Sequence, residues 1–195
     1  MRDNATLKII AGHWRGRWIE FPDTQEIRPT PNRIRETVFN WLMKDIQGAC
    51  CLDAFSGSGA LAFEALSRGA ARVLAFERNA AFATEIKRNA QKLKAENLTI
   101  QAKDFLTSSL PLENLFQLVF LDPPFQQNLL PLALTHLTEQ HCLAKQHRIY
   151  FEVEKTFDLS QLPKGFEIIK NQVAGQVRYG LLEQFIPSSK LRQDL

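Results

Sequence analysis

The stretch that decides the fold is Leu52–Leu61, which reads LDAFSGSGAL. Apolar residues before it predict a buried strand, and the apolar residues after its glycines predict a helix. Gly57 and Gly59 have no Cβ, so a ligand can approach the backbone of the turn between them closely. The stretch therefore predicts the first strand, loop and helix of an α/β sheet that binds a ligand.

Strands and helices alternate along the rest of the chain. This alternation predicts a parallel, doubly wound α/β sheet. Leu7–Ala11 and Trp18–Phe21 are expected to form a hairpin before it, and Thr30 is expected to cap a helix that begins at Pro31. The other expected helices lie near residues 60–68, 80–95 and 129–141, and the expected strands near 50–55, 72–77, 98–102, 118–121, 148–153, 166–173 and 177–185.

The tetrapeptide Asp122–Phe125, DPPF, follows one of these expected strands. Two prolines fix φ twice and remove two N–H donors, so the loop is stiff and offers only acceptors. A carboxylate and proline carbonyls could accept from an exocyclic NH2 group, while Phe125 could stack on the base that bears it. A simple turn with a core phenylalanine would have the same sequence.

Acidic residues follow the first three expected strands of the sheet. Glu77 lies 20 residues beyond Gly57, where a carboxylate accepts from ribose hydroxyls, and Asp104 could hold an adenine amine. The glycines and Glu77 fit a nicotinamide dinucleotide and S-adenosylmethionine about equally. Asp53 favours S-adenosylmethionine, because a carboxylate suits a sulfonium and an ammonium better than a pyrophosphate.

Composition indicates one enzyme-sized domain. The chain has 195 residues, of which 45% are hydrophobic, and no apolar run approaches the ~18 residues of a membrane span. The polar start of the chain argues against a signal peptide. Three cysteines without a paired spacing argue against disulfides or a zinc site, so we expect a cytoplasmic protein. We also expect that it binds no metal and acts as a monomer.

The excess positive charge is confined to the start of the chain. Residues 1–35 hold seven Lys/Arg and four Asp/Glu, whereas the remaining residues hold 17 of each. Residues 14–18, WRGRW, combine arginines with tryptophans, a pattern typical of nucleic-acid contacts. An exposed hairpin with ordinary surface arginines is the alternative interpretation.

Several motifs, in order over residues 7–185, resemble the RsmD family of bacterial 16S rRNA guanine-N2 methyltransferases. The more specific ones are GHWRGR at 12–17, RPT at 28–30 and RIRETVFNWL at 33–42; LDAFSGSGAL, EALSRGA at 64–70 and DPPF complete the pattern. Ser56 departs from it conservatively, since a small residue such as alanine is expected there. The resemblance implies a Rossmann-like, mostly parallel seven-stranded sheet with an antiparallel last strand, S-adenosylmethionine as cofactor, and 16S rRNA in a small ribosomal subunit or assembly particle as partner.

We expect an N-terminal basic hairpin extension over residues 1–30, a methyltransferase domain over 31–186 and a flexible tail over 187–195. An adenine-N6 or cytosine-N4 methyltransferase is the main alternative, and a nicotinamide oxidoreductase is a more distant one. The expected catalytic residues are Asp122, Pro123, Pro124 and Phe125; the expected cofactor-binding residues are Asp53, Phe55, Ser56, Gly57, Ser58, Gly59, Glu77, Arg78, Asp104 and Phe105; the expected RNA-binding residues are Trp14, Arg15, Arg17, Arg28, Arg33 and Arg35.

Overall fold

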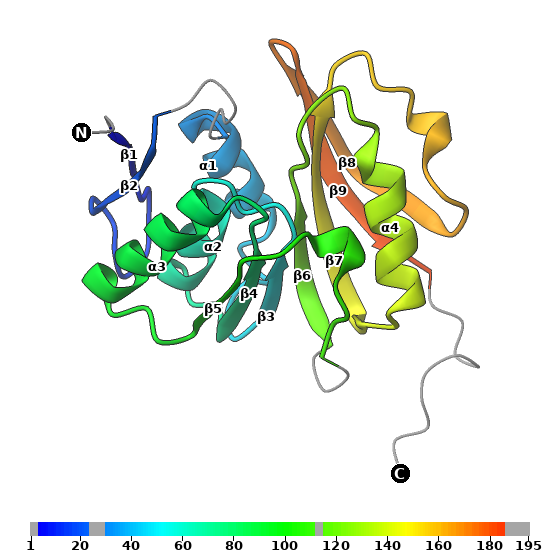
Figure 1. Ribbon diagram of the computed structural model, residues 1–195. Helices are drawn as coiled ribbons and strands as arrows, with labels where there is room; N and C mark the ends of the chain where they lie inside the picture. Colours follow the sequence, from blue (N-terminus) through cyan, green and yellow to red (C-terminus); the bar gives the residue numbers. More distant parts are fainter. Residues whose placement is uncertain (1–3, 24–29, 112–114, 186–195) are drawn as a thin grey trace.

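A seven-stranded sheet forms the centre of the computed structural model, which describes residues 4–23, 30–111 and 115–185 (Figure 1). The strand order is β5-β4-β3-β6-β7-β9-β8. All pairs are parallel except those of β9, which runs antiparallel to β7 and β8. The predicted sheet with an antiparallel last strand is therefore confirmed. Its strands are β3 (Cys50–Asp53), β4 (Arg72–Phe76), β5 (Leu98–Gln101), β6 (Phe116–Leu121), β7 (Leu143–Glu154), β8 (Phe166–Ala174) and β9 (Val177–Gln184).

Helices cover both faces of the sheet because its central strands are apolar on both sides. Alternate residues of β6 enter opposite cores: Leu118 and Phe120 pack with helices α1 and α2, whereas Val119 and Leu121 pack with α4. In Figure 1, α4 lies on one side of the sheet, and α1, α2 and α3 lie on the opposite side. The helices are α1 (Asn32–Trp41), α2 (Ala60–Ser67), α3 (Ala80–Leu93) and α4 (Leu129–Glu139), with 3-10 turns η1 (Phe105–Thr107) and η2 (Leu159–Gln161).

The N-terminal hairpin forms a separate two-stranded sheet of β1 (Asn4–Lys8) and β2 (Trp18–Pro22). Ile9 and Ile19 pack in a third core with Phe63 of α2 and Ile86 of α3. Figure 1 shows the hairpin beside α3, at the far end of the molecule from β8 and β9. These contacts cross the boundary predicted at residue 30, while the predicted tail lies outside the described residues.

The predicted helix cap at Thr30 is wrong. Helix α1 begins at Asn32 after Pro31, without a side-chain cap. The Thr30 hydroxyl instead donates to Asp122 Oδ2 over 3.1 Å, 92 residues further along the chain. The Thr30 hydroxyl, which the local sequence predicted as a helix cap, therefore makes a tertiary hydrogen bond instead.

Candidate active site

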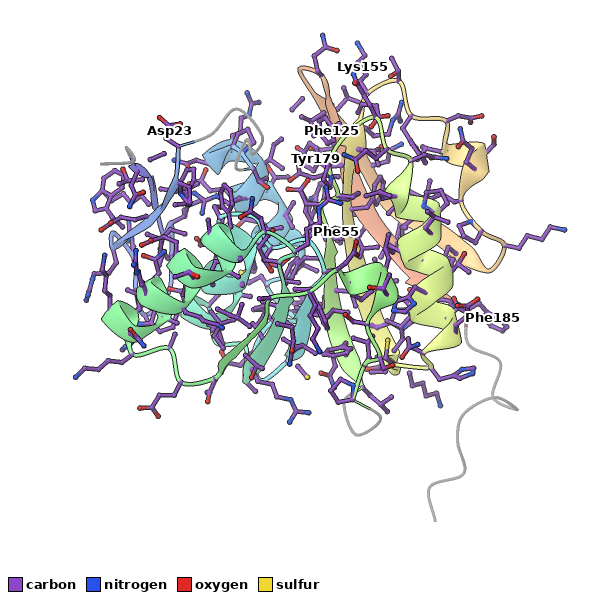
Figure 2. The ribbon with its side chains drawn as sticks, viewed as in Figure 1. Asp23, Phe55, Phe125, Lys155, Tyr179 and Phe185 are labelled. Carbon is purple, nitrogen blue, oxygen red and sulfur yellow. The ribbon has the colours of Figure 1, made fainter. Side chains whose placement is uncertain are left out.

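The chain changes direction within the sheet between β3 and β6. It passes from β3 outward to β4 and β5, then returns to β6 on the other side of β3. Ligands of such sheets bind beyond the carboxyl ends of the strands at this switch point. Phe55 follows β3 and Phe125 follows β6, and Figure 2 labels Phe125 above Phe55, both midway between the left and right sides of the molecule. The glycine loop and the DPPF loop thus meet at the switch point.

Left-handed backbone shapes the loop between β3 and α2. Gly57 has φ of 51° and Gly59 has φ of 79°, conformations that side chains disfavour. A Cβ on Gly59 would also lie 3.0 Å from Cε2 of Phe63, so a larger residue would displace the loop from α2. Ser56 and Ser58 are buried beside these glycines. The loop therefore approaches the start of α2 closely enough to present backbone to a ligand.

Asp53, at the end of β3, is a buried carboxylate that lacks a partner. It is 1% exposed, and neither oxygen has a hydrogen bond among the described residues. The Ser56 hydroxyl and the N–H groups of Phe55 and Ala62 lie close enough to favour the charged form of Asp53. None of them has the distance and angle of a hydrogen bond to its carboxylate. Burial raises the pKa of Asp53 to about 7, and the charge of Glu77 adds to the rise. Such a carboxylate fits a site for a positively charged ligand.

Glu77, after β4, holds the glycine loop from the neighbouring strand. Its Oε2 accepts from the Gly57 N–H over 2.8 Å, and its Oε1 accepts from the Asn79 N–H over 2.7 Å. Burial raises the pKa of Glu77. Each carboxylate oxygen has a second lone pair, so the predicted contacts with ribose hydroxyls stay compatible with these bonds.

The other predicted cofactor residues differ in their exposure. Asp104 caps η1 by accepting from the Leu106 N–H over 2.9 Å, which leaves its second oxygen for a ligand. Phe55 is half-buried and Arg78 is exposed. The ring of Phe105 is 1% exposed and packs against Phe55, so it belongs to the core. The predicted contact of Phe105 with cofactor would therefore have to come from its main chain.

The members of the DPPF loop differ in their exposure. Asp122 is half-buried at the end of β6, and Pro124 is exposed. Phe125 is 38% exposed, which leaves part of its ring for stacking. Pro123 is buried. A small pocket beside this loop is lined by Pro123–Phe125, Asn128–Leu130, Val153, Glu154 and Phe157.

Two polar residues behind Asp122 were missed from the sequence. Thr30 contacts Asp122 as described above, and the charge of Glu152 on β7 helps to raise the pKa of Asp122 after the larger effect of burial. Glu152 is 3% exposed. Its signal in the sequence is an acidic residue inside the apolar run of β7, where a charge is unexpected without a partner.

The hairpin places most of its predicted RNA contacts at the surface. Arg15 and Arg17 are exposed, as is Arg33 at the start of α1. Trp14 is half-buried against the core that joins the hairpin to α2 and α3. Arg28 lies outside the described residues.

The predicted contact of Arg35 with RNA is wrong, because its side chain is 0% exposed and therefore unavailable to RNA. Its Nη1 lies 3.5 Å from Glu64 Oε2, and its Nη2 donates to the Lys8 carbonyl over 3.0 Å. Glu64 is itself 0% exposed and also accepts from the N–H groups of Ile10 and Ala11 and from Arg68 Nε. This Glu64 junction attaches the hairpin to α1 and α2.

Backbone contacts bring the hairpin turn onto the end of α2. The His13 N–H donates to the Ser67 carbonyl over 2.6 Å, and the Trp14 N–H donates to Ser67 Oγ over 2.9 Å. Gly12 permits this approach, since a Cβ there would lie 1.8 Å from the Ser67 carbonyl oxygen. Glycine and tryptophan of the basic motif therefore have structural partners, while its arginines remain free to face a ligand.

Among the residues that the structure describes, no helix is long and apolar enough to cross a membrane. Within the same ranges, no group of three or more His, Cys, Asp or Glu side chains is arranged to hold a metal ion.

A family model described as conserved hypothetical protein 95 matches residues 7–183. The ribosomal RNA small subunit methyltransferase D of Escherichia coli strain K12 is 40% identical over 181 residues, which cover 91% of this chain and 90% of that protein. The protein of the same name from Haemophilus influenzae is 41% identical over 182 residues, covering 91% of this chain and 93% of that protein. The solved structure of the Escherichia coli protein yhhF has a TM-score of 0.82 at 37% identity, covering 92% of this chain and 98% of that chain.

Proposed function

Because the chain belongs to the conserved hypothetical protein 95 family, we propose that it methylates small-subunit ribosomal RNA, on the N2 amine of a guanine. The family and the named relatives support the reaction class and the RNA. The DPPF loop supports an exocyclic amine as the acceptor, and the resemblance to the RsmD family supports guanine.

The unpartnered carboxylate of Asp53 is the observation that best supports the cofactor. S-adenosylmethionine, when bound, supplies an electrophilic methyl group on a positively charged sulfur. Asp53 would face the cationic methionine end, Glu77 would accept from the ribose hydroxyls, and Asp104 would accept from the adenine amine. This assignment gives the buried charge of Asp53 the partner that the protein itself does not provide.

The DPPF loop would hold the target amine. The N2 lone pair of guanine is delocalised into the ring, so the amine is a poor nucleophile. Acceptance of its hydrogens by Asp122 Oδ1 or Oδ2 and by the Pro123 carbonyl would favour a pyramidal nitrogen, while Phe125 stacks on the base. Acceptors fixed at this nitrogen stabilise the positive charge that develops there in the transition state.

The position of the target amine would provide a further part of the rate enhancement. The loop would hold the target nitrogen at the near-attack distance of about 3–3.5 Å from the group that it receives. The cofactor held by Asp53, Glu77 and Asp104 would supply the methyl group, and its sulfur would keep the electron pair of the broken bond. The amine then loses one proton, to Asp122 or to water. Since a stacked base cannot reach this loop, the guanine must flip out or lie in a single-stranded region.

The exposed arginines of the hairpin and of α1 would hold RNA phosphates. Arg15, Arg17 and Arg33 are the described candidates, with Trp14 near a base or in the packing of the hairpin. A ribosomal RNA substrate fits the cytoplasmic location expected from the cysteines. We propose that the protein acts as a monomer.

The test is methyl transfer from tritium-labelled S-adenosylmethionine to small ribosomal subunits from cells that lack the gene, followed by digestion to nucleosides. Label in N2-methylguanosine supports the proposal, whereas label in N6-methyladenosine or N4-methylcytidine would move the activity to another base. Asp122→Ala should lose on the order of 10²–10³ in rate, as expected for one preorganised group, while cofactor binding stays intact. The exposed Asp45→Ala serves as the matched control, and an Asp122→Ala enzyme of wild-type rate would refute the amine-holding role.

A further inference from the structure

Trp18 is a large aromatic side chain that the proposed site does not use and that the fold leaves in contact with water. It stands at the start of β2 and is 58% exposed. Lys8, its cross-strand partner on β1, places its Nζ 5.6 Å from the centre of the indole ring. Because the cation lies over one face of the ring, the exposed area of Trp18 presents the other face as a flat aromatic surface.

The hairpin holds this pair in a fixed orientation. Ile19, next to Trp18, is 0% exposed and packs in the core shared with α2 and α3, so Trp18 points to the outer face of the ribbon. The Ile9 N–H donates to the Arg17 carbonyl over 2.9 Å, and the Gly16 N–H donates to the Ile9 carbonyl over 2.9 Å. These bonds order the turn before any ligand arrives. A ligand that stacks on Trp18 therefore has few protein groups left to order.

The charges around the indole suit a polyanion. Lys8, Arg15 and Arg17 are all exposed. Glu20 is the single acid of β1 and β2, and its carboxylate is paired with Lys92 Nζ over 2.8 Å. Single-stranded nucleic acids are held by this combination, in which bases stack on aromatic rings and phosphates bind the cations beside them. The surface therefore favours RNA over an apolar protein partner, which would gain nothing from the three cations.

This surface lies at the other end of α2 from the proposed methyl transfer. Gly59 precedes α2 at the edge of the sheet where the glycine loop and the DPPF loop meet. The hairpin turn packs at the opposite end, where the His13 N–H donates to the Ser67 carbonyl. The eight residues of α2 span about 12 Å between these ends. A base on Trp18 would therefore belong to a different nucleotide from the target guanine.

We propose that Trp18 and Lys8 form a second RNA-binding site, at which an unpaired nucleotide stacks its base on the indole and places its phosphate on the Lys8 ammonium. The inference rests on the proposed function for the identity of the RNA, but not for the stacking contact. The site holds a part of the RNA that flanks the target. It adds affinity and takes no part in the transfer of the methyl group.

The first test compares the binding of wild type, Trp18→Leu and Trp18→Phe to small ribosomal subunits in the absence of cofactor. Trp18→Leu should weaken binding roughly 5- to 150-fold, the range for one stacked base, whereas Trp18→Phe keeps a ring and should stay within about threefold. Phe185→Leu is the matched control, because Phe185 is 78% exposed on the opposite side of the view from the hairpin (Figure 2). Wild-type affinity in Trp18→Leu would overturn the proposal.

The second test identifies the partner as RNA. A stacked base quenches indole emission, so protein-free 16S ribosomal RNA should reduce the fluorescence of the wild type more than that of Trp18→Phe. Equal quenching of the two proteins, combined with weak binding of Trp18→Leu to subunits, would assign Trp18 to a ribosomal protein and overturn the proposal. Sedimentation tests a second copy as the partner. A dimer of the wild type that Trp18→Leu abolishes would overturn the proposal as well.

The third test separates stacking from charge and from catalysis. Lys8→Gln should reduce the salt slope of RNA binding by nearly one unit, whereas Trp18→Leu should leave the slope unchanged. In steady-state methylation of small subunits, Trp18→Leu should raise KM and keep kcat within about threefold. A lowered kcat with an unchanged KM would place Trp18 in catalysis and overturn the proposal. Thermal unfolding of every variant shows that the protein is folded.

The outcomes for this site and for the proposed function are independent. The binding and fluorescence measurements need no methyl transfer, so a Trp18-dependent affinity stands even if the label appears in a nucleoside other than N2-methylguanosine. Conversely, label in N2-methylguanosine together with wild-type affinity in Trp18→Leu would retain the proposed function and refute the stacking site.

Discussion

Glu64, on helix α2, and Asp53, at the end of β3, are both buried carboxylates, but their surroundings are opposite. Glu64 accepts from two backbone N–H groups and Arg68, and it lies beside the Arg35 guanidinium. Asp53 has no hydrogen-bond partner among the described residues. A buried acid that is satisfied by the protein serves the fold, whereas a buried acid that is left unsatisfied costs stability and suits a ligand. The contrast separates the junction of the hairpin from the site of chemistry.

The largest expected effect comes from removing Glu64, the carboxylate that the protein satisfies. Glu64→Ala should lower the free energy of unfolding by about 3–5 kcal/mol, because it leaves the Arg35 guanidinium buried without its partner. Denaturant titration measures the change. The control is Glu20→Ala, which removes an exposed pair with Lys92 and should cost less than about 1 kcal/mol. Similar losses in the two variants would show that the Glu64 junction is not special.

The next largest effect comes from neutralising Asp53, the carboxylate that the protein leaves unsatisfied. Asp53→Asn should weaken S-adenosylmethionine binding on the order of 10²-fold, since one charge is lost at a few ångströms from the cationic ligand. Its free energy of unfolding at neutral pH should equal or exceed that of the wild type, because the variant no longer buries a charge. Calorimetry and denaturant titration measure the two quantities, with Asp45→Asn as the control. A variant that binds normally would remove Asp53 from the cofactor site.

A smaller effect sharpens the same contrast through pH. The pKa of Asp53 is raised from 3.8 to about 7, so the folded protein binds an extra proton between these values. The stability that the wild type has relative to Asp53→Asn should therefore fall as pH rises from about 4 to about 7. Cofactor affinity should change in the opposite sense and improve by up to about tenfold per pH unit up to pH 7, then level off. The difference between wild type and Asp53→Asn isolates this titration from that of the ligand.

The smallest expected effect comes from comparing exposed and buried arginines within residues 1–35, which carry the excess positive charge. Arg15→Ala combined with Arg17→Ala should weaken RNA binding and reduce the salt slope by up to about two units, nearly one per phosphate contact. Arg35→Ala should lower stability and leave the slope of the folded protein unchanged, because that side chain is buried. Binding titrations across a salt series give the slopes, with Lys145→Ala combined with Lys164→Ala as the charge-matched control. An unaltered slope in the first double variant would place the RNA elsewhere.

Local sequence predicted the parts that local chemistry determines. The alternation of strands and helices, the glycine loop and the DPPF turn all appear where the pattern placed them. Arg35 and Arg15 could not be told apart in the same way, because the difference between them is the contact of Arg35 with Glu64, which lies 29 residues away in the sequence. Thr30 was missed for a similar reason, since its partner Asp122 is distant in the chain.

The hairpin has a consequence for the order of events during synthesis. The N-terminal residues leave the ribosome first, but their partners leave later: Glu64 binds Ile10, Asn89 binds the backbone of Glu20, and Asp122 binds Thr30. At about 5–20 residues per second, the basic segment waits for several seconds before its first tertiary partners exist. The newborn chain therefore displays its arginines beside ribosomal RNA before it has a folded catalytic centre. A slower stretch of translation after residue 89 would lengthen the time available for the hairpin to dock before the second half of the sheet is made.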